Sequence, residues 1–444
     1  MNPLIRKFYS LFMWAAQPFL RRKLLRRGQA EAGYLEFVEE RFGAYLQAPE
    51  KQSELVWVHA VSLGETRTAG ILIDALREQW PGLRILLTHG TATGRAEGAS
   101  LLRGGDVQVW QPWDSEAAVA RFFKHFRPRL GLLMETEVWP NTVARAQACG
   151  VPLALVNARL SDKSLQQSLR IAPLSKPAFA ALAAVYAQSE ADAERLRALG
   201  APVHGVFGNL KFDATPDAAQ QALGRKWRQA RDCPVLMLAS SREGEEEEFL
   251  KQITALALSE RAQAATETIA AGIDESTVMA SPFQLLIVPR HPQRFAEVRA
   301  LVEKHGLSVS RRSSWNGAPP ANADVWIGDS LGEMAVYYTM SDVALLGGSF
   351  APLGGQNLIE AAACGCPVIM GPHTFNFAEA AELAEAAGAA RRVQDMDEAV
   401  RSARAMLIRP SAQKAASAAG LRFAAQHRGA AANTVQALGK LLKG

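Results

Sequence analysis

The sequence has few of the residues that build disulfide scaffolds or zinc sites. Its 444 residues include four cysteines and eight histidines. The histidines are scattered without an HExxH pair or a Cys/His cluster, so no zinc site is expected. Each cysteine lies beside glycine or proline in apolar surroundings, which predicts small buried thiols and a reducing compartment. These cysteines are Cys149, Cys233, Cys364 and Cys366.

The sequence also lacks an apolar run of the roughly 20 residues that a membrane-spanning helix needs. The candidate at residues 8–20 is interrupted by Gln17 and Pro18. No small-residue cleavage site follows it, so a removable signal peptide is not expected. An aromatic segment followed by the basic run 21–27 is typical of a segment lying on an anionic membrane surface. The alternative is a first helix with a solvated basic end.

Neither sign of charge dominates the sequence. The formal net charge is +5, with 48% hydrophobic and 21% charged residues, which is the composition of a globular protein. We find no internal repeat and no nucleic-acid-binding motif, so no nucleic-acid partner is expected. The length is sufficient for two domains with full cores.

In the first half of the chain, short apolar runs alternate with helix-like segments, as in a parallel α/β sheet. Glu65 follows one such run on a glycine turn, and Glu135 and Glu137 follow another. Parallel sheets place reacting groups at such strand ends. Glu65 is either a general base or a charge that stabilises the start of a helix. Glu135 and Glu137 are an acid and base pair, acceptor-binding groups or structural caps. The predicted strands are 55–61, 84–88, 107–110, 130–134, 151–156, 184–187 and 203–206.

The pattern restarts after a boundary near 208–216, and its most informative stretch begins with the predicted strand 343–346. A glycine loop follows, then Asn357 as a helix N-cap and Glu360 in the first helical turn. Backbone N–H groups and a positive helix end suit a phosphate, and Glu360 suits sugar hydroxyls. Alternatively, the glycines only form turns and Glu360 only stabilises the helix dipole.

Two further polar segments follow predicted strands, at 235–239 and 285–288. Ser241 lies at the predicted start of a helix, where hydroxyl and N–H groups could bind a phosphate or a carboxylate. Alternatively, these groups only form a capping box. Arg290 fits a bidentate phosphate clamp, or a capping or ion-paired arginine. The acidic run 245–248 is expected to be a solvated first helical turn.

Three other segments complete the expected organisation. Residues 31–50 have a helical pattern, and residues 256–281 are rich in Ala, Thr and Ser, as in a surface insertion. The tail from residue 396 is expected to be helical, with its last helix packing back on the first domain. The expected parts are a membrane-associating segment at 1–27, a first domain at 28–210 and a second domain at 211–444.

Seven segments, in order over nearly the whole chain, closely resemble the 3-deoxy-D-manno-octulosonic acid (Kdo) transferases of Gram-negative lipopolysaccharide synthesis. Together they are far more specific than a single glycine loop. The segments are Trp57–Glu65, Glu135–Asn141, Asn157–Ser161, Gly208–Asp213, Pro289–Pro292, Gly347–Phe350 and Gly371–Phe377.

The resemblance implies an α/β protein of the GT-B fold, in which two Rossmann-like domains with parallel sheets face across a cleft that holds the active site. It further implies a glycosyltransferase that moves Kdo from CMP-Kdo to a sugar hydroxyl of the tetraacylated lipid A precursor, lipid IVA. The implied location is the cytoplasmic face of the inner membrane, with peripheral attachment or a single N-terminal anchor.

Within this resemblance, Glu65 matches the catalytic carboxylate and would act as general base. No metal or other cofactor is expected, because Arg290 and backbone amides can neutralise the departing CMP. The expected donor-binding residues are Ser241, Arg290, His291, Gly348, Ser349, Asn357 and Glu360. The acceptor-binding candidates are Ser62, Gly64, Arg67, Glu135, Glu137 and Arg159.

The sequence departs from the family pattern at a few places. Leu353 and Gln356 stand where the family often has histidines, and only Gln356 can still donate a hydrogen bond. The segment 256–281 is not part of the pattern. Two other functions stay open: a GT-B enzyme using a UDP-sugar on a membrane lipid acceptor, and a non-catalytic membrane-associated nucleotide-binding module.

Overall fold

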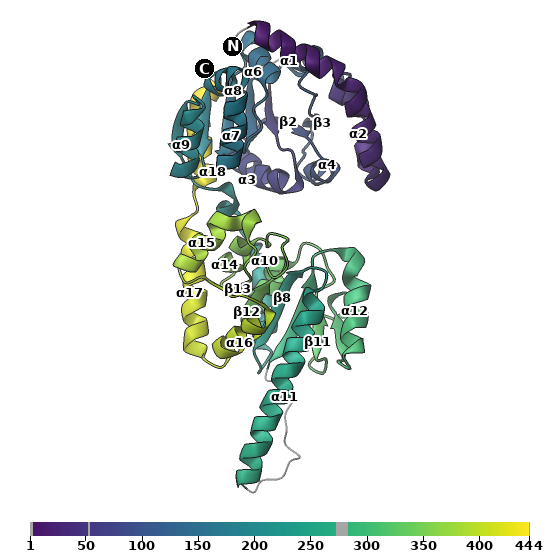
Figure 1. Ribbon diagram of the computed structural model, residues 1–444, viewed down its shortest axis with the longest axis vertical. Helices are drawn as coiled ribbons and strands as arrows, with labels where there is room; N and C mark the ends of the chain where they lie inside the picture. Colours follow the sequence, from purple (N-terminus) through teal and green to yellow (C-terminus); the bar gives the residue numbers. More distant parts are fainter. Residues whose placement is uncertain (1–2, 52–53, 272–282, 444) are drawn as a thin grey trace. The chain divides into compact units, whose positions relative to one another are not determined.

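The computed structural model describes residues 3–51, 54–271 and 283–443. The chain forms two compact units, one made of Met1–Asp213 and His427–Gly444, the other of Ala214–Gln426. Within the described residues, each unit is built on one sheet of seven parallel strands (Figure 1). The chain passes from the first unit to the second inside the 208–216 segment, and the last helix belongs to the first unit.

In the first unit, the strand order is β3-β2-β1-β4-β5-β6-β7. The strands are β1 (Leu55–His59), β2 (Arg84–His89), β3 (Val107–Trp110), β4 (Leu130–Met134), β5 (Leu153–Ala158), β6 (Ala184–Ala187) and β7 (Val203–Val206). The helices are α1 (Pro3–Ala15), α2 (Gln17–Ala30), η1 (Ala32–Leu35), η2 (Val38–Phe42), α3 (Leu63–Gln79), α4 (Ala92–Ala99), α5 (Glu116–Phe126), α6 (Pro140–Ala148), α7 (Asp162–Arg170), α8 (Ala172–Ala180), α9 (Glu190–Ala198), η3 (Leu210–Asp213) and α18 (Ala430–Lys443).

In the second unit, the strand order is β10-β11-β9-β8-β12-β13-β14. The strands are β8 (Val235–Ser241), β9 (Gln284–Pro289), β10 (Val309–Arg311), β11 (Val325–Ile327), β12 (Val343–Leu346), β13 (Val368–Met370) and β14 (Ala390–Arg392). The helices are α10 (Ala218–Gln229), α11 (Glu245–Ala271), η5 (Pro292–Arg294), α12 (Phe295–Lys304), η6 (Arg312–Ser314), α13 (Met334–Thr339), α14 (Leu358–Ala363), η7 (Phe375–Phe377), α15 (Ala378–Ala386), α16 (Met396–Leu407) and α17 (Pro410–Gln426).

The central strands of the first sheet are buried on both faces, which explains why their sequences are continuously apolar. On one face, the Trp57 ring packs against Phe122 and Phe123, with ring centroids 4.9 and 5.8 Å away. Gly131 on β4 makes room for this ring, since a Cβ there would lie 2.8 Å from Trp57 Cε3 and 2.4 Å from Leu153 Cδ2. The glycine is therefore required by packing rather than by a turn.

Each sheet has a topological switch point, where successive strands are added on opposite sides of the first strand. In the first unit the switch point lies between β1 and β4, and in the second between β8 and β12. Ligands of open α/β sheets bind outside the carboxyl ends of the strands at such points. The loops that follow these four strands are therefore the first places to look for a site.

Several expectations from the sequence are wrong. Residues 31–50 contain only the short 3₁₀ helices η1 and η2, separated by Phe37 with a φ of 49°. Cys149 is exposed, and of the four thiols only Cys366 is buried. The surface insertion expected at 256–281 is not contradicted and stays a prediction: residues 256–271 continue helix α11, and residues 272–281 lie outside the described residues.

The N-terminal helix α1 has an unusual distribution of side chains. None of the described helices combines the length and apolar character needed to cross a membrane. The inward side of α1 carries the half-buried Ile5 and Met13 together with polar contacts: the Tyr9 hydroxyl bonds to buried Asp114, and Ser10 Oγ donates to Asn141 Oδ1 at 3.1 Å. Large apolar side chains are exposed to solvent on this helix, namely Leu4, Phe8, Leu11, Phe12 and Trp14.

Helix α18 is held on the first unit by a carboxylate distant in sequence. Gly429 precedes this helix and has no side chain to cap it, but Asp213 accepts hydrogen bonds from Gly429 N at 2.5 Å and Ala431 N at 2.6 Å. The helix then buries Val435 and Leu438 in the same core as α3. Asp213 thus acts as an N-cap supplied from elsewhere in the chain.

We predict that Asp213→Ala lowers the free energy of unfolding by about 1–2 kcal/mol, because two amides at the start of α18 lose their acceptor. Amide hydrogen exchange should become faster throughout α18. Asp395→Ala, which removes the N-cap of α16, is the matched control and should leave α18 exchange unchanged. Unaltered α18 protection in Asp213→Ala would show that apolar burial alone holds the helix.

Candidate functional site

Glu65 lies in the first turn of α3, directly after β1 and beside the switch point of the first unit. Its carboxylate accepts hydrogen bonds from Val61 N at 2.9 Å and Ser62 Oγ at 3.0 Å, and its own amide donates to Ser62 Oγ at 3.3 Å. This arrangement is a variant of the capping box, in which the carboxylate accepts from the amide of the residue before the N-cap instead of from the N-cap amide. The alternative role of Glu65 as a helix N-terminal group is therefore real, and it also fixes the position of the carboxylate.

Burial raises the pKa of Glu65 from its ordinary value of 4.5 to about 7, although the hydrogen bonds from Val61 and Ser62 favour the charged form. The negative charges of Glu135 and Glu137 add to the increase in pKa. A carboxylate that exchanges its proton near neutral pH is suited to general base catalysis. Three carboxylates from the ends of β1 and β4 therefore form one electrostatic group.

Two residues at the carboxyl ends of β4 and β5 have strained backbones: Glu135, directly after β4, and Asn157, the penultimate residue of β5. Glu135 and Asn157 are buried and have φ values of 57° and 51°, in the left-handed region that non-glycine residues rarely adopt. Asn157 Oδ1 accepts from Leu210 N at 2.9 Å, whereas its Nδ2 has no hydrogen-bond partner within the described parts of the chain. Strain of this kind concentrates at functional sites.

Lys211 joins the same group from η3, the short 3₁₀ helix that follows β7. Burial lowers the pKa of Lys211, and the negative charges of Glu135 and Glu65 oppose that decrease. Lys211 is not among the residues predicted for the site from the sequence. Its signal in the sequence is its position in the segment Gly208–Asp213, one of those that resemble the family.

The other acceptor-binding candidates of the first unit are in different environments. Arg159 forms an ion pair of 2.7 Å with Glu135 and is half exposed, so it belongs to the carboxylate group. A Cβ on Gly64 would meet nothing within 4 Å, which leaves open space above the first turn of α3. Arg67 instead points to Glu97 on α4, with an ion pair of 3.0 Å at the surface.

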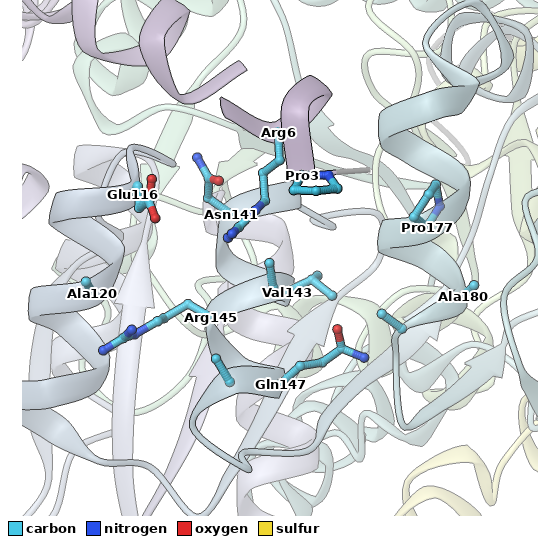
Figure 2. Close-up of a pocket in the computed structure, with 13 residues that line it drawn as sticks. Pro3, Arg6, Glu116, Ala120, Asn141, Val143, Arg145, Gln147, Pro177 and Ala180 are labelled. Atoms are coloured by element: carbon cyan, nitrogen blue, oxygen red, sulfur yellow. The ribbon is translucent and has the colours of Figure 1, made fainter. Parts of the chain in front are cut away.

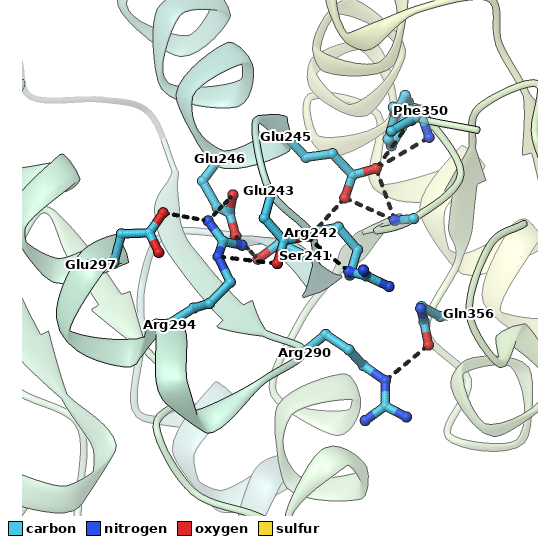
Figure 3. Close-up of polar contacts among 12 residues, drawn as sticks. Ser241, Arg242, Glu243, Glu245, Glu246, Arg290, Arg294, Glu297, Phe350 and Gln356 are labelled. Atoms are coloured by element: carbon cyan, nitrogen blue, oxygen red, sulfur yellow. Dashed lines mark hydrogen bonds and ion pairs between the residues drawn. The ribbon is translucent and has the colours of Figure 1, made fainter. Parts of the chain in front are cut away.

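In the second unit, the glycine loop after β12 binds a carboxylate of the protein itself (Figure 3). Both carboxylate oxygens of Glu245 accept from Gly348 N at 2.8 Å, and Oε1 also accepts from Phe350 N at 3.3 Å and Ala351 N at 3.4 Å. The side chain of Glu245 also accepts from Arg242 N at 2.9 Å. The loop does seat an anion, but the anion is Glu245.

This arrangement corrects part of one prediction. In the acidic run 245–248, which was expected to be solvated, Glu245 is 4% and Glu246 0% exposed, whereas Glu247 and Glu248 are exposed. Ser241 and Ser349 are also fully buried: Ser241 Oγ donates to Glu246 Oε1 at 2.7 Å, and Ser349 Oγ donates to Leu346 O at 2.5 Å. We therefore leave both hydroxyls, and the Gly348 amide, out of the candidate donor subsite.

Cationic groups lie beside the glycine loop at the ends of β8 and β9. Arg290 Nε donates to Gln356 Oε1 at 3.2 Å (Figure 3). The pKa of His291 is lowered by burial and by the positive charges of Arg242 and Arg290, which shows that these groups are close together. A Cβ on Gly348 would approach Gln356 Nε2 to 3.2 Å, so the loop lies against this cluster.

Asn357 and Glu360 begin the short helix α14 that follows the loop. Asn357 Oδ1 accepts from Ile359 N at 3.1 Å, so Asn357 is the N-cap that the sequence predicts. Glu360 is in the first helical turn, and its charge raises the pKa of Cys364 and Tyr338, in each case less than burial does. Among the described residues, no group of three or more His, Cys, Asp or Glu side chains is arranged to hold a metal ion.

Known proteins resemble this chain in sequence over nearly its whole length. The sequence model of a family described as 3-deoxy-D-manno-octulosonic-acid transferase (kdotransferase) matches residues 36–214. The chain is 46% identical over 441 residues to the 3-deoxy-D-manno-octulosonic acid transferase of Bordetella pertussis, covering 98% of each chain. It is 31% identical over 432 residues to the protein of that name from Haemophilus influenzae, covering 96% of each chain.

Solved structures with low sequence identity show the same fold. A glycosyltransferase from Rickettsia africae is 14% identical with a TM-score of 0.51, covering 89% of this chain and 100% of that chain. A UDP-GlcNAc 2-epimerase from Neisseria meningitidis is 15% identical with a TM-score of 0.52, covering 87% and 99%. The two parallel sheets thus form the α/β architecture of GT-B proteins. The identity of the chain to its relatives over nearly its full length shows that it belongs to the family of 3-deoxy-D-manno-octulosonic acid transferases, which are glycosyltransferases.

Proposed function

We propose that this protein transfers Kdo from CMP-Kdo to a sugar hydroxyl of the tetraacylated lipid A precursor, lipid IVA. The family supports Kdo as the transferred sugar. The observation that carries the mechanism is Glu65, whose carboxylate is held beside a switch point with its pKa raised to about 7. Near neutral pH a large fraction of this group is ionised while it remains a useful base.

In the proposed reaction, ionised Glu65 takes the proton of the acceptor hydroxyl. That oxygen forms a bond to the anomeric carbon of Kdo, and the bond from this carbon to the phosphate oxygen of CMP breaks. CMP leaves with the electron pair as an anion. Lys211 and Arg159 would hold the acceptor's anionic and hydroxyl groups next to the base, because both contribute to the electrostatic group around Glu135.

The donor subsite would be formed by the cationic cluster of the second unit. Arg290 and Arg242 would bind the phosphate of CMP-Kdo, and His291 and Gln356 would supply further hydrogen bonds. Glu360 would accept hydrogen bonds from the ribose hydroxyls. Because the departing CMP is an anion, these fixed positive charges stabilise it as it forms, and we propose that no metal is required.

We further propose that the protein associates peripherally with the cytoplasmic face of the inner membrane through α1 and α2. The exposed apolar side chains of α1 include Phe8 at 72% and Phe12 at 67% exposure, and Arg22, Lys23 and Arg26 of α2 are exposed. An apolar face next to basic residues is typical of helices that lie in an anionic interface. A lipid acceptor would be met at the same surface.

We expect Glu65→Gln to lower kcat for Kdo transfer by roughly 10²–10⁴-fold, because the base is lost. The amide can still serve the capping box, so α3 should keep its start. Transfer from CMP-Kdo to lipid IVA is followed by mass spectrometry, and CMP binding by calorimetry should remain unchanged. Glu78→Gln, on the exposed side of the same helix, is the matched control.

Stability should not limit this comparison. The raised pKa of Glu65 means that the folded protein binds this proton more tightly than the unfolded chain, so the free energy of unfolding falls as pH rises from 4.5 through about 7. Removing the charge should therefore not weaken the fold at pH 8. If wild-type protein binds CMP but forms no Kdo product, the proposed reaction is wrong and a UDP-sugar donor becomes the alternative.

The pH dependence provides a separate prediction. Since ionised Glu65 is the active form, kcat/KM in the free enzyme should fall tenfold per pH unit below about pH 7. Of the two neighbouring carboxylates, Glu135 raises the pKa of Glu65 more than Glu137 does. Glu135→Gln removes this negative charge, so it should lower the pKa of Glu65 and move the acid limb of the profile to lower pH. The pH–rate profile measures the shift, and an unmoved limb would show that another group controls it.

Metal dependence is tested with excess chelator. We expect the rate of Kdo transfer to change by less than about twofold in EDTA, because arginine side chains neutralise the leaving group. Restoration of a lost rate by Mg²⁺ or Mn²⁺ would contradict the proposed metal-free chemistry.

A further inference from the structure

A pocket of about 570 Å³ lies under α1, and none of the residues assigned to transfer lines it (Figure 2). Its walls come from α1, α5, α6 and α8. Alanines such as Ala120 and Ala180 leave the space open, and the charged side chains that line it are Arg6, Arg145 and Glu116. Figure 2 shows Arg6 descending from α1 and Arg145 extending from α6 toward α5.

The two arginines lack the partners that such groups usually have. Within the described residues, neither Arg6 nor Arg145 forms an ion pair. Arg145 Nε is buried and has no hydrogen-bond partner there, which is unfavourable for a polar group. Its position in the last turn of α6 favours a positive charge through the helix dipole, but the dipole provides no acceptor for Nε. The Nε–H group of Arg145 is therefore a donor for which a bound ligand could supply the hydrogen-bond acceptor.

The charges of the pocket specify the chemistry of its occupant. Two guanidinium groups against the single carboxylate of Glu116 leave one net positive charge. Guanidinium groups bind phosphate with particular strength, because their parallel N–H groups match its oxygens. Glu116 would accept hydrogen bonds from the hydroxyls of an alcohol headgroup that is esterified to that phosphate. An anionic phosphodiester with a hydroxylated headgroup satisfies both requirements.

The position of the pocket indicates where this phosphate comes from. Arg6 is on the half-buried side of α1, between the outward-facing Leu4 and Phe8. Apolar faces of interfacial helices enter roughly 5–10 Å into the headgroup and acyl boundary. Arg6 would then lie at the level of lipid phosphates. This step rests on the membrane contact proposed above.

We infer that the pocket lined by Arg6 and Arg145 binds the phosphate of an anionic phospholipid headgroup. This lipid would be a ligand that the protein binds at the membrane surface in addition to its two proposed substrates, the lipid acceptor and CMP-Kdo. Binding would fix the start of α1 against α6, next to the contacts of Tyr9 with Asp114 and of Ser10 with Asn141. The site would thereby set the orientation of the helix on the bilayer.

The test uses the full-length protein and short-chain lipids that stay monomeric in solution. Calorimetry should show that dihexanoyl phosphatidylglycerol binds more tightly than dihexanoyl phosphatidylcholine or inorganic phosphate. Arg6→Gln and Arg145→Gln should each weaken phosphatidylglycerol binding roughly tenfold, and Arg145→Lys should weaken it less, since it keeps the charge but loses the fork. Lys124→Gln, one turn beyond Ala120 on α5, removes the same charge outside the pocket and should change binding by less than about twofold.

Several outcomes would overturn the inference. Equal binding of the two lipids would remove the anionic selectivity, and unchanged binding in Arg145→Gln would place the lipid elsewhere. Inorganic phosphate bound as tightly as phosphatidylglycerol would make a soluble anion the ligand. Flotation with phosphatidylglycerol vesicles tests the membrane contact separately, and Kdo transfer in detergent tests the proposed reaction. A wild-type protein that floats with no vesicle would overturn the lipid as occupant, whereas absence of Kdo transfer alone would leave the lipid result standing.

Discussion

The arrangement of both units depends on one constraint, the reversal of strand order around the first strand of a parallel sheet. Crossover connections are right-handed, so the helices that follow β1 and β4 must leave toward opposite faces of the sheet. Neither helix covers the carboxyl ends of the two strands at that point, so polar side chains that bind ligands lie there. Glu65 and Glu135 follow the two diverging strands of the first unit, and Glu245 and Gly348 follow those of the second.

The two switch points meet this constraint in different ways. In the first unit, carboxylates are gathered without enough positive charge to neutralise them, and burial together with their mutual repulsion keeps the proton of Glu65 exchangeable near neutral pH. In the second unit, the amides of the glycine loop are satisfied internally by Glu245, and the cationic side chains Arg242 and Arg290 remain beside it. Because Glu245 already accepts from the amide of Gly348, the arginines rather than that amide would bind the phosphate in the proposed donor subsite.

The sequence predicts most of this fold because buried parallel strands are apolar without interruption. The runs at 107–110, 130–134 and 343–346 coincide with β3, β4 and β12. Strands β10 and β14 were not predicted, because they lie at the edges of their sheet, are three residues long and are partly exposed. The positions of Glu65, Asn357 and Glu360 at helix starts were predicted from local capping rules. The partner of the glycine loop could not be, since about a hundred residues separate Glu245 from Gly348.

The helix α1 inverts the usual amphipathic arrangement, and this inversion has an energetic basis. A helix on a soluble domain normally buries its apolar stripe, whereas α1 turns Tyr9 and Ser10 inward and leaves Phe8 and Phe12 in solvent. Besides the half-buried Ile5 and Met13, its docking uses hydrogen bonds to Asn141 and to the buried carboxylate of Asp114. Burial raises the pKa of Asp114 to about 6, although Asn141, Thr142 and Tyr9 all donate to it. Hydrogen bonds direct orientation more than they add stability, so the exposed apolar face is held in a defined direction while its own burial is left to a partner. In the membrane contact proposed above, a bilayer surface would supply that burial, and Arg6 and Arg145 beneath the helix would supply positive charge to its anionic headgroups.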